Sequence, residues 1–174
     1  MKNSKGFTLI EVIIVVAIIG IMTAISIPAI SSWLPNYRLK AATRELYSDM
    51  QKIKLIAVKR NTNVGIAFAT VTFPTTGGSY QAFVDDGAGG GTAGNAIQDG
   101  TEMTLFKTSL PVGCSLTTAI FSGVNTGYNS KGLPLINSVG HVEMRNNKSK
   151  WYRLALSNSG YVKIYVSSDG ATWN

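Results

Sequence analysis

An uncharged, strongly apolar stretch near the N-terminus constrains this 174-residue chain more than any other feature. No charged residue occurs from Val12 to Tyr37, and residues 12–30 are mostly Ile, Val, Ala and Met. A helix needs about 20 apolar residues to cross the hydrocarbon core of a bilayer. Lys2 and Lys5, before the stretch, match the positively charged cytoplasmic flank of a membrane segment. The sequence therefore predicts a membrane-spanning helix here.

A secretory signal peptide is the first alternative for this stretch. Such a signal has a shorter apolar region followed by a small-residue cleavage site, whereas this run is longer and no Ala-x-Ala site follows it before the amphipathic segment begins. Glu11 lies at the start of the run. Because a carboxylate that faces lipid is costly, an acidic residue at this place predicts a functional role with an oppositely charged partner. An interfacial Glu11 that reaches headgroup water is the other interpretation.

The residues around Glu11 resemble a known processing signal. The stretch Lys5-Gly-Phe-Thr-Leu-Ile-Glu11, with the apolar run behind it, is similar to the class III signal of type IV pilins and type II secretion pseudopilins. The resemblance implies that a prepilin peptidase cuts after Gly6 and methylates the amine of Phe7. It also implies that Glu11 neutralises the N-terminal amine of a neighbouring subunit during assembly, where a low dielectric strengthens an ion pair.

The helical pattern continues beyond the apolar run. Six apolar residues recur at the three- and four-residue intervals of an amphipathic helix: Leu39, Ala42, Leu46, Met50, Ile53 and Ala57. We therefore expect one helix of roughly 53 residues, about 80 Å long, from Thr8 to about Arg60. Pro28 and Pro35 should kink it, because each lacks a backbone donor. Gly20 is a further weak point. In the pilin family the segment that corresponds to Gly20–Pro28 loosens in the filament; an ordinary proline kink is the alternative.

After the helix the period becomes that of β-strands. Runs of β-branched and aromatic residues predict strands at 64–68, 71–73, 80–84, 103–108, 115–121, 141–145, 151–156 and 161–167. Gly-rich residues 85–95 predict a long flexible loop, and residues 123–134 a connection. Ser157–Gly160 predicts a tight hairpin. The expected fold class is α+β: a long N-terminal transmembrane and amphipathic helix followed by an antiparallel β-sheet body.

The net charge of +7 is unevenly distributed along the chain. Residues 35–60 and 141–163 are strongly basic, whereas residues 61–106 carry only acidic charges. A basic surface indicates nucleic acid, anionic lipid or an acidic protein as a partner. The single cysteine, Cys114, excludes an intramolecular disulfide, and its apolar neighbours favour burial.

Motifs along the body resemble the GspH/FimT-type branch of pseudopilins. They comprise residues 57–64, Asp85–Asp86 with its Gly-rich loop, Phe121, residues 127–134 and residues 151–165. Members of this branch are minor subunits, at the tip of a periplasmic secretion pseudopilus or at the start of a type IV pilus. The resemblance implies as partners the prepilin peptidase, other pilin or pseudopilin subunits, the inner-membrane assembly platform and the membrane. It implies a periplasmic C-terminal domain on a single-pass inner-membrane anchor, and then a place in the filament.

DNA binding for natural transformation is the alternative function. Some pilin-side members of the branch bind DNA through a basic Gly-Arg-x-Arg stretch, which here reads Gly160-Tyr-Val-Lys163 and keeps one of the two cations. Cations neutralise phosphates and aromatic rings stack on bases. Five cations near the last strands, interleaved with Trp151, Tyr152 and Tyr161, form the candidate patch: Arg145, Lys148, Lys150, Arg153 and Lys163. A solvated loop with tyrosines packed on the sheet is the favoured interpretation.

The sequence indicates no enzyme. With one His, His141, and one Cys, no spacing predicts a nucleophile and base together. Asp85, Asp86 and Asp99 around the Gly-rich loop could hold calcium, but they match no EF-hand spacing, and a flexible acidic loop is the simpler interpretation. Residues 87–92 are not followed by Lys and predict no phosphate loop. We therefore expect no catalytic site, no metal and no cofactor.

Four segments and a structural role are thus expected. Residues 1–6 form a prepilin leader, 7–34 a membrane and filament-core helix, 35–60 its amphipathic half, and 61–174 a globular β-sheet domain. The expected function is that of a minor pilin or pseudopilin that is processed and then assembled into a type II secretion pseudopilus or a type IV pilus. A single-span membrane protein with a periplasmic domain is a third class, in which residues 1–6 stay uncut.

Overall fold

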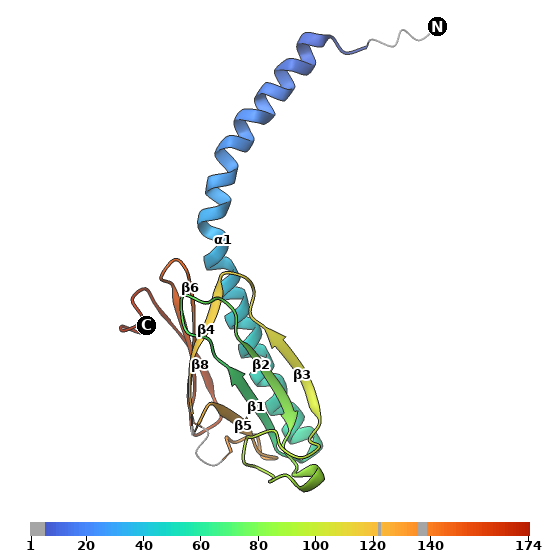
Figure 1. The fold of residues 1–174 in the computed structure, drawn as a ribbon, viewed down its shortest axis with the longest axis vertical. Coiled ribbons are helices and arrows are strands. Elements are labelled where there is room, and N and C mark those ends of the chain that lie inside the picture. The colour runs from blue at the N-terminus through green and yellow to red at the C-terminus, as the bar shows by residue number, and fades with distance from the viewer. Residues whose placement is uncertain (1–5, 122, 136–138) are drawn as a thin grey trace. The chain divides into compact units, whose positions relative to one another are not determined.

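The computed structural model describes residues 6–121, 123–135 and 139–174. Over these residues the chain forms a long helix, a short 3-10 helix and eight strands in two antiparallel sheets, which confirms the predicted α+β class (Figure 1). Contacts within the chain define two units, the second of which, Pro35–Asn174, we call the body. Lys2 and Lys5 lie outside the described residues.

Helix α1 spans Leu9–Arg60, close to the predicted bounds. It is continuous through Pro28 and Pro35, and the expected kinks and loosening at Gly20–Pro28 stay predictions. Hydroxyl groups in its apolar part bond back to the helix: Thr23 Oγ1 donates to the carbonyl of Ile19 (2.9 Å), and Ser26 Oγ to that of Met22 (2.7 Å). Such internal pairing lets a polar side chain enter an environment without water.

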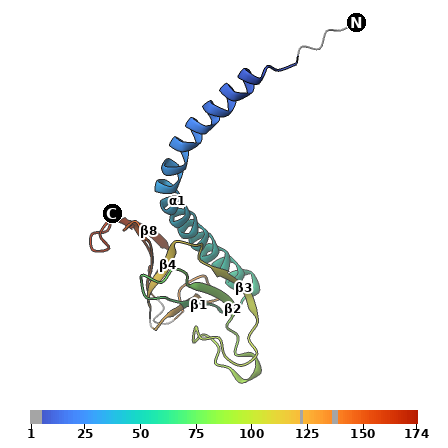
Figure 2. The ribbon, with the colours of Figure 1, turned by 45° about the horizontal axis from the view of Figure 1, so that its top comes forward.

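The C-terminal part of α1 is amphipathic, as predicted. All six apolar residues of the predicted stripe are buried: Leu39, Ala42, Leu46, Met50, Ile53 and Ala57. Figures 1 and 2 show this part of α1 alongside the strands of the body. Its buried face joins side chains of both sheets in one apolar cluster. Burial of that face therefore stabilises the helix through tertiary packing more than through its intrinsic propensity.

The first sheet has the strand order β3-β2-β1-β5, with β1 Val64–Ala69, β2 Ser79–Val84, β3 Thr104–Ser109 and β5 Asn125–Tyr128. The strand predicted at 71–73 is wrong. The Val71 N–H donates to the carbonyl of Leu116 (2.8 Å) and the Thr75 N–H to that of Thr72 (3.0 Å), so this segment turns beside β4. Strand β5 falls in the predicted connection.

The second sheet has the order β4-β6-β7-β8, with β4 Cys114–Ile120, β6 Gly140–Asn146, β7 Trp151–Leu156 and β8 Val162–Ser167. The hairpin between β7 and β8 is confirmed. Gly160 has a φ of +73°, in the left-handed region that glycine adopts at low cost, and its N–H donates to the carbonyl of Ser157 (2.9 Å).

The core lies wholly within the body. Among the described residues, the members of its buried apolar cluster run from Leu39 to Val162 and all belong to the body. Cys114 is buried in this cluster, as predicted, and burial raises the pKa of its thiol to about 11. The body thus has its own hydrophobic core.

Candidate functional site

Thr8 caps the N-terminus of α1. Its Oγ1 accepts a hydrogen bond from the Glu11 N–H (3.3 Å), and its carbonyl accepts one from the Val12 N–H (3.3 Å). An acidic residue three positions after such a cap also lies favourably at the positive end of the helix dipole. The Thr8-x-x-Glu11 spacing is the sequence signature of a capping box. Sequence reasoning took Glu11 as an assembly residue and missed this second role.

The Glu11 side chain borders an apolar groove on the helix surface. The groove, of about 290 Å³, is lined by Phe7, Glu11, Val12, Val15 and Val16. All five residues are exposed. Among the described helices, the stretch Leu9–Pro28 is long and apolar enough to cross a membrane, and none of it is buried within the structure. An exposed apolar surface of this extent needs lipid or another apolar surface to cover it.

The outer face of the second sheet, opposite the core, carries three of the five predicted patch cations. Strand alternation and register put Arg145, Arg153 and Lys163 on this face, since Arg145 pairs with Trp151, Arg153 with Glu143, and Lys163 with Ala155. Tyr152 points to the other face: its register partners are Met144 and Val166, and it packs against the core cluster. The expected interleaving of Tyr152 with the cations is therefore wrong.

Arg153 is occupied by intramolecular partners. Its Nε donates to Oε1 of Glu143 (2.9 Å), and its guanidinium lies 3.9 Å from the ring centroid of Trp173. His141 Nε2 is 3.5 Å from the same Glu143 oxygen. Burial, reinforced by the charge of Arg153, lowers the pKa of His141 below its ordinary value. His141 is therefore neutral at pH 7, and Glu143 compensates the charge of Arg153.

Arg145 is enclosed between aromatic rings. Its guanidinium lies 3.6 Å from the centroid of Phe73 and 4.4 Å from that of Trp151, which is the geometry of a double cation–π contact. Lys148 and Lys150 are not on this face but in the turn between β6 and β7. Lys163 is exposed on the outer face, and its ammonium lies 4.6 Å from the ring centroid of Tyr165. The tertiary structure divides the predicted patch.

The Gly-rich loop after β2 is fastened by its own carboxylates. Asp85 is fully buried and accepts hydrogen bonds from the N–H groups of Gly94 (2.6 Å) and Ala96 (2.8 Å). Asp99 accepts from the Thr92 N–H (3.1 Å), and Glu102 from the Gly87 N–H (2.9 Å). Each carboxylate thus bonds the backbone of a different part of the loop, and these internal hydrogen bonds define its shape. Within the described residues, no three His, Cys, Asp or Glu side chains lie close enough to hold a metal ion.

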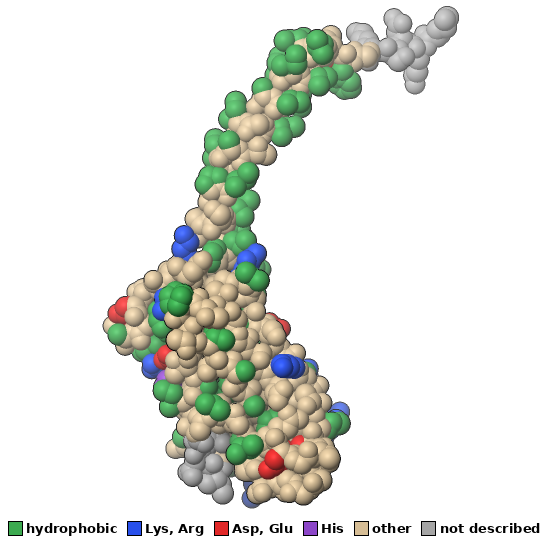
Figure 3. Space-filling view, in the orientation of Figure 1, with side chains coloured by type: hydrophobic (Ala, Val, Ile, Leu, Met, Phe, Trp, Pro, Cys, Tyr) green, Lys and Arg blue, Asp and Glu red, His purple; other side chains and the backbone are tan. Residues whose placement is uncertain are grey.

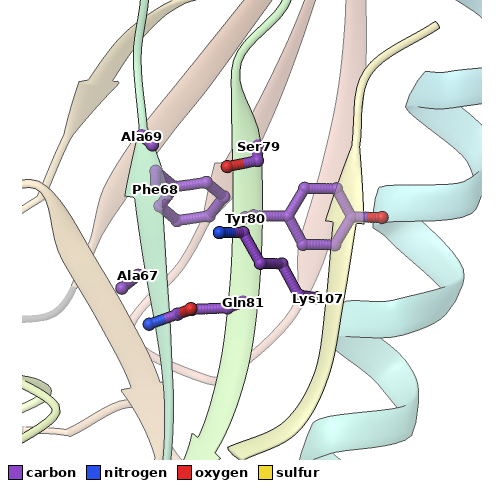
Figure 4. Close-up of a pocket in the computed structure, with 7 residues that line it drawn as sticks. All are labelled: Ala67, Phe68, Ala69, Ser79, Tyr80, Gln81 and Lys107. Atoms are coloured by element: carbon purple, nitrogen blue, oxygen red, sulfur yellow. The ribbon is translucent and has the colours of Figure 1, made fainter.

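A hollow of about 260 Å³ lies over the first sheet (Figure 4). Its lining comprises Ala67, Phe68, Ala69, Ser79, Tyr80, Gln81 and Lys107. Figure 4 shows the Tyr80 ring pointing toward α1, where its hydroxyl donates to Asp49 Oδ2 (2.8 Å). Burial and this hydrogen bond raise the pKa of Tyr80. The remaining polar groups of the lining are an ammonium, an amide and a hydroxyl, which do not form a nucleophile–base pair.

Comparisons with known proteins match both parts of the chain. Residues 1–27 match a family model for the prokaryotic N-terminal methylation motif. Residues 42–160, well over half of the chain, match the model of type II transport protein GspH. The chain belongs to the GspH family. The two matches agree with the resemblances noted in the sequence, one at the N-terminal processing signal and one along the body. Together they describe a pilin-like structural subunit with a methylation motif.

Curated pilins are similar to this member of the GspH family over part of their length. A fimbrial protein of Pseudomonas aeruginosa is 35% identical over 100 residues, which cover 52% of this chain and 65% of that protein. The pilin-like protein PilA1 of Thermus thermophilus is 33% identical over 85 residues, 48% of this chain and 50% of that protein. The chain thus spans one half to just under two thirds of these relatives. No solved structure matches significantly.

Proposed function

We propose that this chain is a minor, structural subunit of a filament built like a type II secretion pseudopilus or a type IV pilus. A prepilin peptidase removes residues 1–6 and methylates Phe7. The subunit is anchored in the inner membrane with its body in the periplasm, and an assembly platform moves it into a filament of similar helices. The subunit has no catalytic role.

One observation carries this proposal: a capped helix exposes an apolar stretch, Leu9–Pro28, while the body buries a separate core of its own. A helix with such a surface is covered either by lipid or by other apolar helices. Glu11 lies beside Phe7 at the start of this surface. A carboxylate at that position would meet the methylated amine of a neighbouring subunit in an environment of low dielectric, where opposite charges attract strongly.

Processing at Gly6 gives the first test. Replacing Gly6 by a bulky residue, Gly6→Leu, is expected to leave the precursor uncut and the subunit absent from filaments. A Cβ at Gly6 meets no atom of the described chain within 4 Å, so the change does not disturb the fold. Gel mobility of the chain, expressed with its prepilin peptidase, measures the cleavage. Normal cleavage of Gly6→Leu would contradict the assigned cutting site, and Gly20→Leu in the same stretch serves as the control that should still be cut.

DNA binding through the outer face of the second sheet is the alternative function, and we expect it to fail. Arg153 is bonded to Glu143 and lies against the ring of Trp173. Arg145 lies between the rings of Phe73 and Trp151. The face therefore offers few free cations to phosphates. We expect the detergent-solubilised chain to bind single-stranded DNA with a dissociation constant weaker than about 100 µM at physiological salt. Fluorescence anisotropy measures it. Micromolar binding that disappears in Lys163→Ala but not in the control Lys131→Ala would support the alternative.

A further inference from the structure

Three separate segments meet at the end of the body where its part of α1 begins. The Asn146 side chain donates through Nδ2 to Oδ1 of Asn36 (2.8 Å). Arg38 donates through Nη1 to the carbonyl of Val112 (3.4 Å). The turn between β6 and β7 and the connection between β3 and β4 therefore both lie beside the first residues of the body helix, as Figure 1 also shows.

This end of the body is rich in cations. Arg38 and Lys40 come from α1, and Lys148 and Lys150 from the turn after β6. Asn146 Oδ1 accepts the N–H groups of Lys148 (2.9 Å) and Lys150 (3.0 Å), which fixes the shape of this turn. Within the described residues, none of these four cations has a carboxylate within 4.0 Å.

An acidic side chain, Asp169, lies in the segment after β8, which follows the pairing of Ser167 with Trp151 at the start of β7. Its carboxylate accepts the N–H groups of Ala171 (2.9 Å) and Thr172 (2.9 Å) and the hydroxyl of Ser167. These hydrogen bonds lower its pKa, the one from Ser167 most. Asp169 is thus engaged in its own turn and does not pair with the lysines.

Apolar side chains lie among these cations. Val112, 79% exposed, projects from the connection between β3 and β4, and Tyr37, 61% exposed, from α1. In Figure 3, Lys and Arg side chains lie beside hydrophobic ones at this end of the body. We call the set the basic collar: Tyr37, Arg38, Lys40, Val112, Lys148 and Lys150. Cations mixed with Tyr and an exposed aliphatic side chain are typical of surfaces that meet the headgroup region of a membrane.

We propose that the basic collar rests on an anionic lipid surface while the subunit is anchored in the membrane. The inference rests on the proposed membrane stage. Asn36 lies eight positions after Pro28, a span of at most about 28 Å even when extended, so the covalent link keeps the collar close to the bilayer surface. Each cation near such a surface strengthens the attachment roughly fivefold. Collar and anchor together would hold the body against the surface until the subunit leaves the bilayer.

The test uses the full chain in nanodiscs. A polar fluorophore is attached to the variant Asn147→Cys, at the exposed turn, and lipids with a quencher on the headgroup report its distance from the surface; the native Cys114 is buried and stays unlabelled. We expect strong quenching with a mixture of phosphatidylglycerol and phosphatidylcholine, weak quenching with phosphatidylcholine alone, and loss of the difference in high salt, which screens exposed charges.

Charge reversal with a matched control decides whether the collar is responsible. Lys148→Glu with Lys150→Glu is expected to reduce the ratio of attached to free bodies by at least about 25-fold, from the two lost cations. Lys59→Glu with Arg60→Glu changes the net charge equally at the other end of α1, about 33 Å from Arg38, and should leave quenching unchanged.

Three outcomes would contradict the proposal that the collar rests on anionic lipid. They are equal quenching on neutral and anionic discs, no quenching on either, and equal loss of quenching in both charge variants. Co-elution of the chain with the discs is recorded separately. Its failure would contradict the proposed membrane anchor and not the collar.

Discussion

Filaments assembled with Glu11→Ala are expected to lack this subunit, although the precursor is still cut after Gly6. Removing one partner of a buried ion pair costs about 3–5 kcal/mol, which lowers incorporation by roughly 100-fold or more. The structure adds a competing explanation, because the backbone N–H of Glu11 donates to the cap residue Thr8, and at this position of a capping box the side chain of Glu11 can also stabilise the start of α1. The loss of a cap costs about 1 kcal/mol and would have a far smaller effect. Incorporation is measured by immunoblot of sheared filaments, and cleavage by gel mobility.

Glu11→Gln separates charge from capping. Gln serves as well as Glu at this position of a capping box, but it cannot neutralise an amine. If Glu11 acts by its charge, Glu11→Gln fails like Glu11→Ala, and Thr8→Ala, which removes the cap and keeps the acid, is incorporated nearly normally. Normal incorporation of Glu11→Gln would contradict the charge role and leave helix capping as the function of this residue.

Replacing Gly65 by valine is expected to destabilise the first sheet markedly. Gly65 pairs with Phe83 of β2, and a Cβ at Gly65 would overlap the Phe83 ring. Phe83 is fully buried, so its ring has no free space to enter. Overpacking of this kind costs about 1–3 kcal/mol. The midpoint of thermal unfolding should fall by about 5–10 °C, measured by near-ultraviolet circular dichroism.

A neighbouring position provides the control. Ala67 lies on the same face of β1, two residues further on, and borders the open hollow of Figure 4. Ala67→Val should therefore be nearly neutral, because valine suits a strand and meets no packed ring. The double variant Gly65→Val with Phe83→Ala should cost less than the sum of the two single changes, since the smaller side chain makes room. Strict additivity would show that the ring is not the cause.

The sequence by itself determined the features that depend on short spacings along the chain. The apolar run and Glu11 identified the pilin-type signal, and the stripe from Leu39 to Ala57 predicted which side of the helix is buried. The signal is a continuous motif that resembles that of a known family, and the stripe follows from the 3.6-residue period, which places neighbours without any knowledge of the rest of the fold. The hairpin at Ser157–Gly160 belongs to the same class, because two strands and a glycine turn determine each other locally.

Strand β5 and the acidic loop were decided by tertiary contacts. Asn125–Tyr128 carries no alternation of its own and is a strand because Gly127 packs closely against β1, where a Cβ would lie 2.6 Å from the Val64 carbonyl oxygen. Asp85 looked like a residue of a flexible loop, yet it is buried and closes that loop through backbone N–H groups from residues 94 and 96. Pairing between distant segments produces both results.

The cations near the C-terminus depended most on the tertiary structure. In the sequence Arg145, Lys148, Lys150, Arg153 and Lys163 form one basic patch. In the fold, strand alternation and the turn after β6 separate these cations. Arg153 is bonded to Glu143, and Arg145 lies against aromatic rings. Lys148 and Lys150 lie instead beside the start of the body helix. Local spacing assigns a charge to a strand or a turn. Only the packing of distant segments decides which charges share a surface and which are already paired.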